Sequence, residues 1–122
     1  KFLGIIDLIK AKALLSMEFE AIVPELNADS AMEWIGAINP ILKKSLVKQH
    51  KQIVPLTIRL DASNRILLIS GPNAGGKSVC LKTVGLLQYM YQCGIPVPLK
   101  EGSKATIFKN IFIDLVEEKN EH

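Results

Sequence analysis

Residues 71 to 78 read Gly-Pro-Asn-Ala-Gly-Gly-Lys-Ser, which matches the GxxxxGK[ST] pattern of a phosphate-binding loop. The three glycines of this stretch let the backbone curl so that successive N–H groups turn toward one anion. In such a loop Lys77 would reach the β- and γ-phosphates, and the Ser78 hydroxyl would ligate Mg²⁺. The pattern therefore predicts a bound nucleoside triphosphate with Mg²⁺. The alternative is an ordinary glycine-rich turn between a strand and a helix.

The segments on both sides of this stretch give it the context that a phosphate-binding loop requires. Residues 65–70 form a continuous apolar run, which is typical of a central strand covered on both faces. Residues 77–92 predict a helix that is apolar nearly all round, ended by Gly94 and Pro96, and buried on most sides. Its N-terminal dipole would point at the same phosphates. The predicted nucleotide-binding residues are Gly71, Pro72, Asn73, Ala74, Gly75, Gly76, Lys77, Ser78 and Val79.

The remaining patterns predict the rest of an α/β unit. Residues 1–22 repeat apolar side chains at spacings of three and four and predict a helix packed on more than one side, ending before Pro24. Residues 53–60 alternate like a half-buried strand, residues 61–64 predict a polar turn, and residues 106–114 predict a last strand. Strand, strand, helix and strand in this order predict a layered α/β domain.

Composition places the chain among globular proteins, with 122 residues, 48% hydrophobic and 22% charged. No apolar run approaches the ~20 residues that span a bilayer, so no membrane partner is expected. Cys80 and Cys93 are too far apart for a C-x-x-C zinc pair; we interpret them as buried, reduced thiols, which favours a cytoplasmic location. Because the sequence lacks a starting Met and ends in a polar acidic run, we expect a piece of a longer protein.

Two further features have a structural and a functional interpretation. The lysines of residues 43–51 surround His50, and charge patterning favours a solvated face, with DNA contact as the alternative at a net charge of +3. Trp34 is predicted to be a core or interdomain residue, with base stacking as the alternative.

In Asn39-Pro40 the proline favours an extended or turn conformation at Asn39.

Hydrolysis of a bound nucleotide requires an acid near the metal, and one candidate is present. The predicted last strand ends in Asp114, which could hold Mg²⁺ through water. The alternative is a strand that leaves the core and enters solvated acidic residues, here Glu117 and Glu118.

The stretch from Ile66 to Val79 closely resembles the ATPase core of the MutS family, in which Gly-Pro-Asn is followed by Gly-Gly-Lys. Its continuation, residues 81–87, resembles the second, recombination-suppressing branch rather than the mismatch-repair branch. The resemblance covers most of the chain. It implies an α/β fold: the N-terminal part of a P-loop NTPase (ABC/MutS-like) domain over residues 33–122, preceded by the end of a helical lever over residues 1–32.

The same resemblance implies a DNA-acting ATPase that uses ATP and Mg²⁺ and forms a homodimer through its ATPase domain. Members of this branch are associated with DNA repair, with restraint of homologous recombination, with a C-terminal nuclease domain and with collided ribosomes. In the family, adenine is held near the stretch that corresponds to Val54-Pro55-Leu56, which makes His50, Ile53 and Val54 candidates for adenine contact.

The sequence departs from the family pattern at two places. Asn39 stands where the family has His, and residues 116–119 replace a Gly-Asp-Glu-Gln-like turn, which removes a glutamine near the attacking water. The Asp-Glu pair that holds Mg²⁺ in the family lies downstream of this sequence. These departures favour the strand-ending interpretation of Asp114, and we expect this chain alone to bind ATP without turnover.

Two other function classes were weighed against this interpretation. A P-loop small-molecule kinase would use Asp114 as its acid, but it needs an arginine-rich lid, and the sequence contains only Arg59 and Arg65. A non-enzymatic dimerisation or scaffolding module would tolerate decay of the loop, yet Lys77 and Ser78 are intact.

Overall fold

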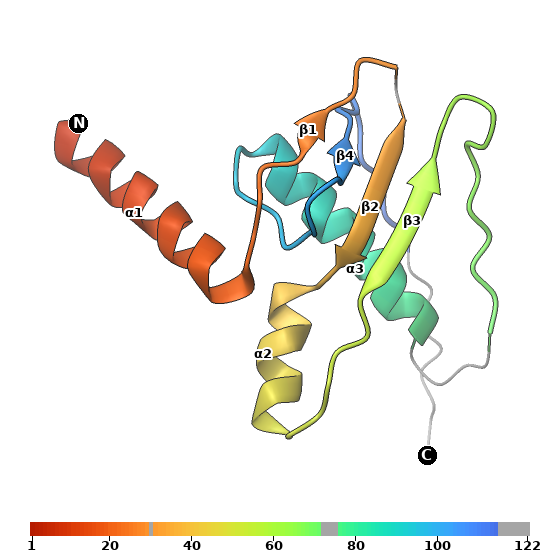
Figure 1. The fold of residues 1–122 in the computed structure, drawn as a ribbon, viewed down its shortest axis with the longest axis horizontal. Coiled ribbons are helices and arrows are strands. Elements are labelled where there is room, and N and C mark those ends of the chain that lie inside the picture. Colours follow the sequence, from red (N-terminus) through yellow and green to blue (C-terminus); the bar gives the residue numbers. More distant parts are fainter. Residues whose placement is uncertain (30, 72–75, 115–122) are drawn as a thin grey trace.

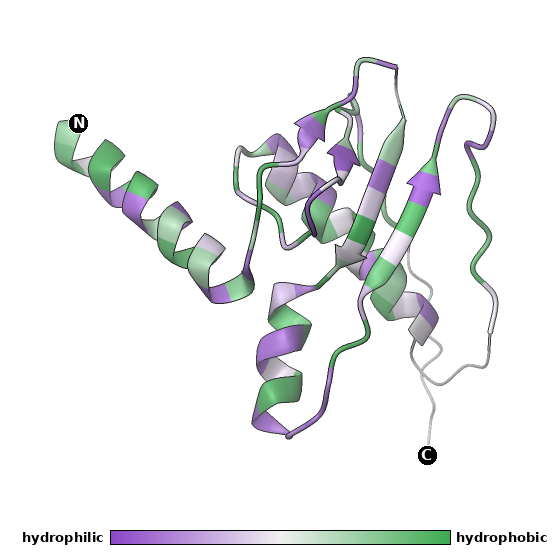
Figure 2. Ribbon diagram, viewed as in Figure 1, coloured by the Kyte–Doolittle hydropathy of each residue, from purple (hydrophilic) through white to green (hydrophobic). Residues whose placement is uncertain are grey.

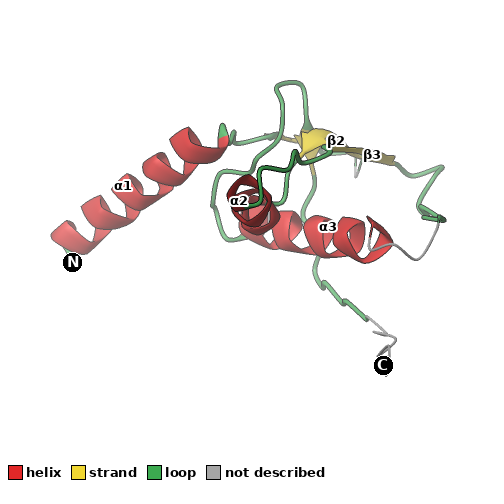
Figure 3. Cartoon of the chain, turned by 90° about the horizontal axis from the view of Figure 1, so that it is seen from below, coloured by secondary structure: helices red, strands yellow, loops and turns green. Residues whose placement is uncertain are grey.

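The computed structural model of the chain describes residues 1–29, 31–71 and 76–114 (Figure 1). Its elements are α1 (Phe2–Phe19), β1 (Glu25–Leu26), β2 (Met32–Ala37), α2 (Pro40–Lys48), β3 (Leu56–Leu60), α3 (Gly76–Gln92) and β4 (Lys104–Ala105). The strands form one mixed sheet in the order β1-β4-β2-β3. Helix α3 lies along one face of this sheet (Figure 3). The described chain is thus a mixed α/β structure built on one small sheet.

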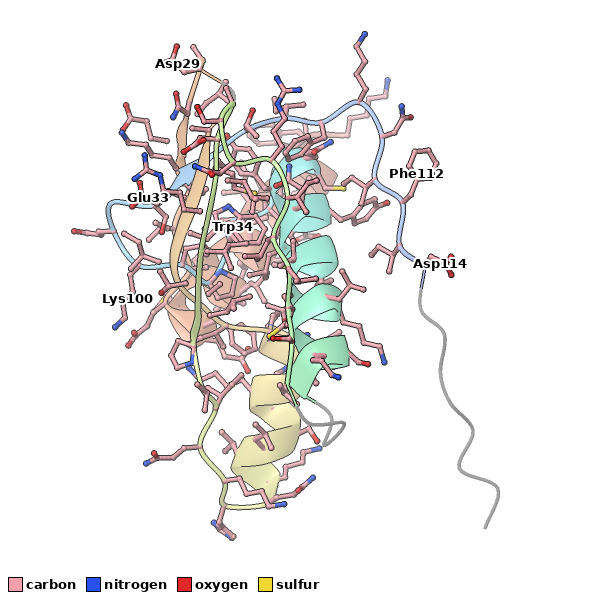
Figure 4. The ribbon with its side chains drawn as sticks, turned by 90° about the vertical axis from the view of Figure 1, so that its right-hand side faces the viewer. Asp29, Glu33, Trp34, Lys100, Phe112 and Asp114 are labelled. Carbon is pink, nitrogen blue, oxygen red and sulfur yellow. The ribbon has the colours of Figure 1, made fainter. Side chains whose placement is uncertain are left out.

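The core lies between β2, β3 and α3. Strands β2 and β3 are antiparallel, with Trp34 opposite Ile58, and alternation turns both side chains toward the helix. Trp34 is fully buried between the sheet and α3 (Figure 4), which confirms the prediction of a core residue. The buried cluster consists of Met32, Trp34, Ala37, Ile58, Leu87, Met90, Val97 and Leu99.

A β-bulge in β2 depends on Gly36. The pairing register between β2 and β3 shifts between Trp34 and Ala37, and Gly36 has a φ of +60°, which is costly for residues with a Cβ. Its N–H donates to the Thr57 hydroxyl at 3.1 Å, so the extra residue leaves no buried donor unpaired.

Helix α1 confirms the predicted N-terminal helix, but its packing differs from the prediction. It ends at Phe19, and Glu20 follows in the left-handed region with a φ of 51°. The helix extends away from the sheet, and the green stretches of its ribbon in Figure 2 mark its hydrophobic residues. The exposed ones are Phe2, Leu3, Ile5, Ile6, Leu8, Ile9, Leu14 and Met17. The prediction that α1 packs on more than one side is therefore wrong here: only Phe19 is buried.

Helix α2 is an element that the sequence patterns did not predict. Asn39 is extended as predicted, with φ −76° and ψ 114°, but it serves as an N-cap. Its Oδ1 accepts hydrogen bonds from the N–H groups of Ile41 at 3.0 Å and Leu42 at 3.2 Å. Pro40 occupies the first helical position, where a missing N–H costs nothing. The Asn-Pro pair therefore begins a helix rather than a turn.

Two predicted strands are absent from the described sheet. Residues 65–70 run extended outside β3 but belong to no strand, and Ile66 and Leu68 are 90% and 88% exposed. The last strand was predicted over residues 106–114, whereas β4 is confined to Lys104–Ala105. An apolar run becomes a buried strand only where another strand pairs with it, and β3 is the edge of this sheet.

Helix α3 confirms the predicted helix, and Gly94 ends it with a φ of +74°. Its burial is one-sided, because Leu81 and Tyr89 are 39% and 64% exposed. The prediction of a helix buried nearly all round is wrong in this respect. Both cysteines are free thiols, but Cys93 is exposed and Cys80 is half-buried, so the prediction of buried cysteines is also wrong.

Candidate functional site

The candidate phosphate-binding loop leads into the N-terminus of α3. Pro72, Asn73, Ala74 and Gly75 lie outside the described residues. On the far side, residues 76–79 form the first turn of α3, as predicted. The structure therefore describes the helix that the loop would use, and phosphate binding by the loop itself stays a prediction.

The first turn of α3 has the electrostatic character that an anion site needs. The first four N–H groups of a helix have no partner within it, and the helix dipole adds partial positive charge there. No acidic residue occupies this turn, and Lys77 adds a cation. The Lys77 side chain is half-buried and Ser78 is exposed. Phosphate oxygens are the groups that this arrangement suits, and Mg²⁺ binding at Ser78 stays a prediction.

The glycines that flank the loop are not required by the packing of the described residues. A Cβ added at Gly71 or at Gly76 would meet no other described atom within 4 Å. By contrast, a Cβ at Gly85 would collide with the Ile113 side chain. Glycine at positions 71 and 76 is instead what a tightly curved loop beside a phosphate group would need.

The three predicted adenine contacts lie between α2 and β3 and differ in their surroundings. Ile53 lines a cleft of about 290 Å³ together with Leu46, Val47, Lys43, Lys51 and Gln52. His50, with a φ of 55°, and Val54, 88% exposed, do not line it. The lining combines apolar side chains with two lysines and a glutamine, and adenine binding there stays a prediction.

This cleft and the first turn of α3 lie toward the same end of the molecule. In Figures 1 and 4, α2 and the N-terminal end of α3 both point to the bottom of the picture. The connection from α2 through residues 51–55 to β3 follows that end as well. The connection that carries the predicted adenine contacts and the first turn of α3 are therefore grouped at one end, although they are far apart in sequence.

Part of the lysine cluster of α2 contacts α1. The Nζ atoms of Lys43 and Lys44 lie 6.0 and 5.8 Å from the centre of the Phe19 ring. Lys44 Nζ also lies 3.4 Å from the Glu18 carboxylate. The predicted solvated face is thus partly an intramolecular contact. DNA contact by this cluster stays an untested alternative.

Asp114 is the last described residue, and it is exposed (Figure 4). Within the described ranges no group of three or more His, Cys, Asp or Glu side chains is placed to hold a metal ion. A metal role for Asp114 therefore stays a prediction.

A pair of glutamines on α3, which the sequence analysis did not single out, holds the segment that leads to Asp114. Gln88 Nε2 donates to the carbonyl of Thr106 at 2.8 Å. The Gln92 amide pairs with both backbone groups of Phe108: its Nε2 donates to the carbonyl at 2.9 Å, and its Oε1 accepts from the N–H at 3.1 Å. The available signal was two amides four residues apart in the mostly apolar C-terminal half of the helix.

Closer to the N-terminus of α3, an apolar cleft of about 240 Å³ lies between this helix and the segment of residues 106–114. Residues 110–113 line one wall, and Leu81, Val84 and Gly85 of α3 line another. Ile113 lies against Gly85, whereas Phe112 is 89% exposed and points away from α3 (Figure 4).

The predicted polar turn at residues 61–64 joins β3 to the exposed apolar run. Asp61 Oδ1 accepts from the N–H groups of Asn64 at 2.8 Å and Ser63 at 2.9 Å. These two bonds, in that order, and more weakly the nearby Arg59 guanidinium lower the pKa of the Asp61 carboxyl. Arg65 Nε donates to the Ala62 carbonyl at 3.3 Å. Both arginines of the chain are thus engaged at this turn.

The sequence of the chain is similar over almost its whole length to one stretch of proteins named Endonuclease MutS2. Identity is 42% over 115 residues with that of Finegoldia magna, 39% over 115 residues with that of Lactobacillus helveticus, and 37% over 120 residues with that of Agathobacter rectalis. These matches cover 94–98% of the chain, and the chain spans 14% of the length of each relative. No protein-family model matches the chain. No helix in its described part is long and apolar enough to cross a membrane.

Proposed function

We propose that the chain is the part of a MutS2-type protein that binds the phosphates of ATP, with Mg²⁺ ligated by Ser78. The observation that carries the proposal is the GxxxxGK[ST] pattern that runs directly into the first turn of α3. Similarity to MutS2 proteins at 37–42% identity supports it. Residues Gly71–Val79, in the loop and the first turn of α3, would bind the phosphates, and Ile53, with His50 and Val54 nearby, would contact the adenine.

In the proposed site, backbone N–H groups, a lysine and a serine hydroxyl would have different roles in binding ATP. Backbone N–H groups of the loop and of the first turn of α3 would bind the phosphate oxygens, while Lys77 neutralises the β- and γ-phosphates. Mg²⁺ would bridge phosphate oxygens and the Ser78 hydroxyl and would keep most of its water. We expect this chain to bind ATP without turnover, because residues 116–119 depart from the Gly-Asp-Glu-Gln-like turn of the family.

The activity of the longer protein is part of the same proposal. Its relatives are named endonucleases, and we propose a cytoplasmic, DNA-binding ATPase that acts as a homodimer in DNA repair or in suppression of recombination. The nuclease activity and any ribosome contact would belong to other parts of that protein. A small-molecule kinase gains no support, since Arg59 and Arg65 both lie at the Asp61 turn.

Calorimetric titration with ATP and Mg²⁺ tests the proposal directly. Wild-type chain should show saturable heat and a raised melting temperature, and Lys77→Ala should lose at least about tenfold in affinity, because one charge-assisted phosphate contact is removed. Lys82→Ala removes the same charge from the same helix and serves as the matched control. Equal affinities for wild type and Lys77→Ala, or absence of saturation on folded wild type, would refute the proposal.

A further inference from the structure

We propose that Gln88 and Gln92 act together as a substitute strand edge. Their side-chain amides would hold the backbone of Thr106–Phe108 on α3, and they would thereby couple the segment ending at Asp114 to the helix that begins at the candidate phosphate loop. They would be positioning residues. We call these hydrogen bonds of Gln88 and Gln92 to residues 106–108 the clamp. The coupling of the clamp to ATP rests on the proposed function, whereas the clamp itself does not.

The hydrogen bonds reproduce what a neighbouring strand would provide. A strand partner donates to a carbonyl and accepts from an N–H of the same residue, and the Gln92 amide does both for Phe108. Gln88 Nε2 also donates to Gln92 Oε1 at 2.7 Å, which fixes the orientation of the second amide. The backbone of Thr106 and Phe108, which follow β4 in sequence, therefore forms hydrogen bonds with side chains of α3 instead of with a strand.

The Gln88 contact is buried, whereas the Gln92 contacts with Phe108 are exposed to solvent. Gln88 and Thr106 are 4% and 7% exposed, so the hydrogen bond between them is shielded from water. A buried carbonyl that loses its donor keeps its desolvation cost, so replacing Gln88 by an apolar residue would disfavour this path of the segment. By contrast, the side chain of the exposed Gln49 bonds to Ser45, four residues earlier in the sequence.

The contacts place the segment antiparallel to α3. Phe108 meets Gln92, and Ile113 meets Gly85 about two turns closer to the helix N-terminus. Glycine at position 85 gives Ile113 room to lie on the helix backbone. The chain is thus led from the C-terminal end of α3 toward its phosphate end, and a shift of α3 on binding ATP would be carried to Phe108 through Gln92.

Hydrogen exchange by NMR tests the clamp on the full chain without nucleotide. The Phe108 amide should exchange about tenfold faster in Gln92→Leu than in wild type, because its acceptor is lost. The Ile58 amide reports on the core and should be unchanged, and Gln49→Leu should leave Phe108 unchanged. An equal Phe108 rate in wild type and Gln92→Leu would overturn the clamp. If Gln92→Leu speeds both amides, Gln92→Glu decides, because it keeps an acceptor for the Phe108 N–H: a rate slower than in the leucine variant supports the clamp, and an equal rate overturns it.

The coupling is tested by adding ATP and Mg²⁺ to the same variants. In wild type, exchange should slow about threefold or more both in the first turn of α3 and at Phe108. In Gln92→Leu only the first turn should respond. Protection of Phe108 by ATP in both proteins, or in neither while the first turn responds, would overturn the coupling. Absence of any response at the first turn would instead refute the proposed function. The clamp would then be judged by the exchange rates measured without nucleotide.

Discussion

Residues 56–60 and residues 66–69 lie on opposite sides of the Asp61 turn, and both are rich in Ile and Leu. The first run forms β3 and places Ile58 in the core at 6% exposure, whereas Ile66 of the second run is 90% exposed. The difference is a partner: β3 is paired with β2, and no described strand pairs with residues 66–69. Apolar composition makes a strand suited to burial, but a second strand far away in sequence decides whether it is buried.

The candidate site lies where these two kinds of region meet. Helix α3 is anchored in the core by Leu87 and Met90, and the exposed run leads into the loop before it. The orientation of the N-terminal end of α3, where we propose that phosphate binds, is therefore set by how α3 packs. Perturbing the core should disturb the site more than perturbing the exposed run.

The largest expected effect comes from the same change, leucine to alanine, made once in the core and once in the exposed run. Leu87→Ala removes a fully buried side chain beside Trp34 and should cost about 2–5 kcal/mol of unfolding free energy. Leu68→Ala truncates a side chain that is 88% exposed and should change stability by less than about 0.5 kcal/mol. Urea unfolding followed by Trp34 fluorescence measures both values.

One outcome of these two substitutions would contradict the contrast between the core and the exposed run. If Leu68→Ala costs as much as Leu87→Ala, the run at residues 66–69 is packed in solution and the contrast with β3 disappears. A solubility gain for Leu68→Lys with unchanged stability would instead sharpen it, because an exposed apolar run favours aggregation.

A smaller effect is expected at α2, which lies between the two regions. Pro40 is the one residue of α2 that is buried, so the helix depends on its cap more than on packing. Asn39→Ala removes the acceptor for the N–H groups of Ile41 and Leu42 and should cost about 1 kcal/mol. Asn39→Ser keeps a capping oxygen and should stay within about 0.5 kcal/mol of wild type. Equal urea midpoints for wild type and the alanine variant would show that tertiary contacts, rather than the cap, hold α2.

Sequence patterns predicted the elements whose signals are local. The helix after the loop, its stop at Gly94, the strand before the Asp61 turn and the core role of Trp34 are all confirmed. Each rests on a periodicity, a turn residue or a large apolar side chain, which act over a few positions. Strand β2 was missed because Gly36 and the bulge interrupt its alternation.

The missed or wrong predictions are those that depend on non-local pairing. Burial of residues 65–70 and strand pairing of residues 106–114 were inferred from apolar content, which does not specify a partner. At the site, the loop pattern predicts roles for Lys77 and Ser78. The spacing of Gln88 and Gln92 places two amides on one side of α3, but it does not specify that they hold Thr106 and Phe108. Such side-chain to backbone pairing depends on two segments meeting in space.

The smallest expected effect concerns the Asp61 turn, which marks the boundary between the two runs. Because the N–H groups of Asn64 and Ser63 lower the pKa of the folded Asp61 carboxyl, the ionised form stabilises the turn. That contribution should be complete above the unfolded pKa, about 4 for Asp, and should be lost as pH falls through the lower folded pKa. Urea midpoints of wild type and Asp61→Asn should therefore differ slightly at neutral pH and converge as the pH falls below about 4, with Asp7→Asn as the control for charge loss on exposed α1. A gap between wild type and Asp61→Asn that stays constant or widens on acidification would show that the carboxylate does not hold the turn, and β3 would then end without a fixed boundary to the exposed run.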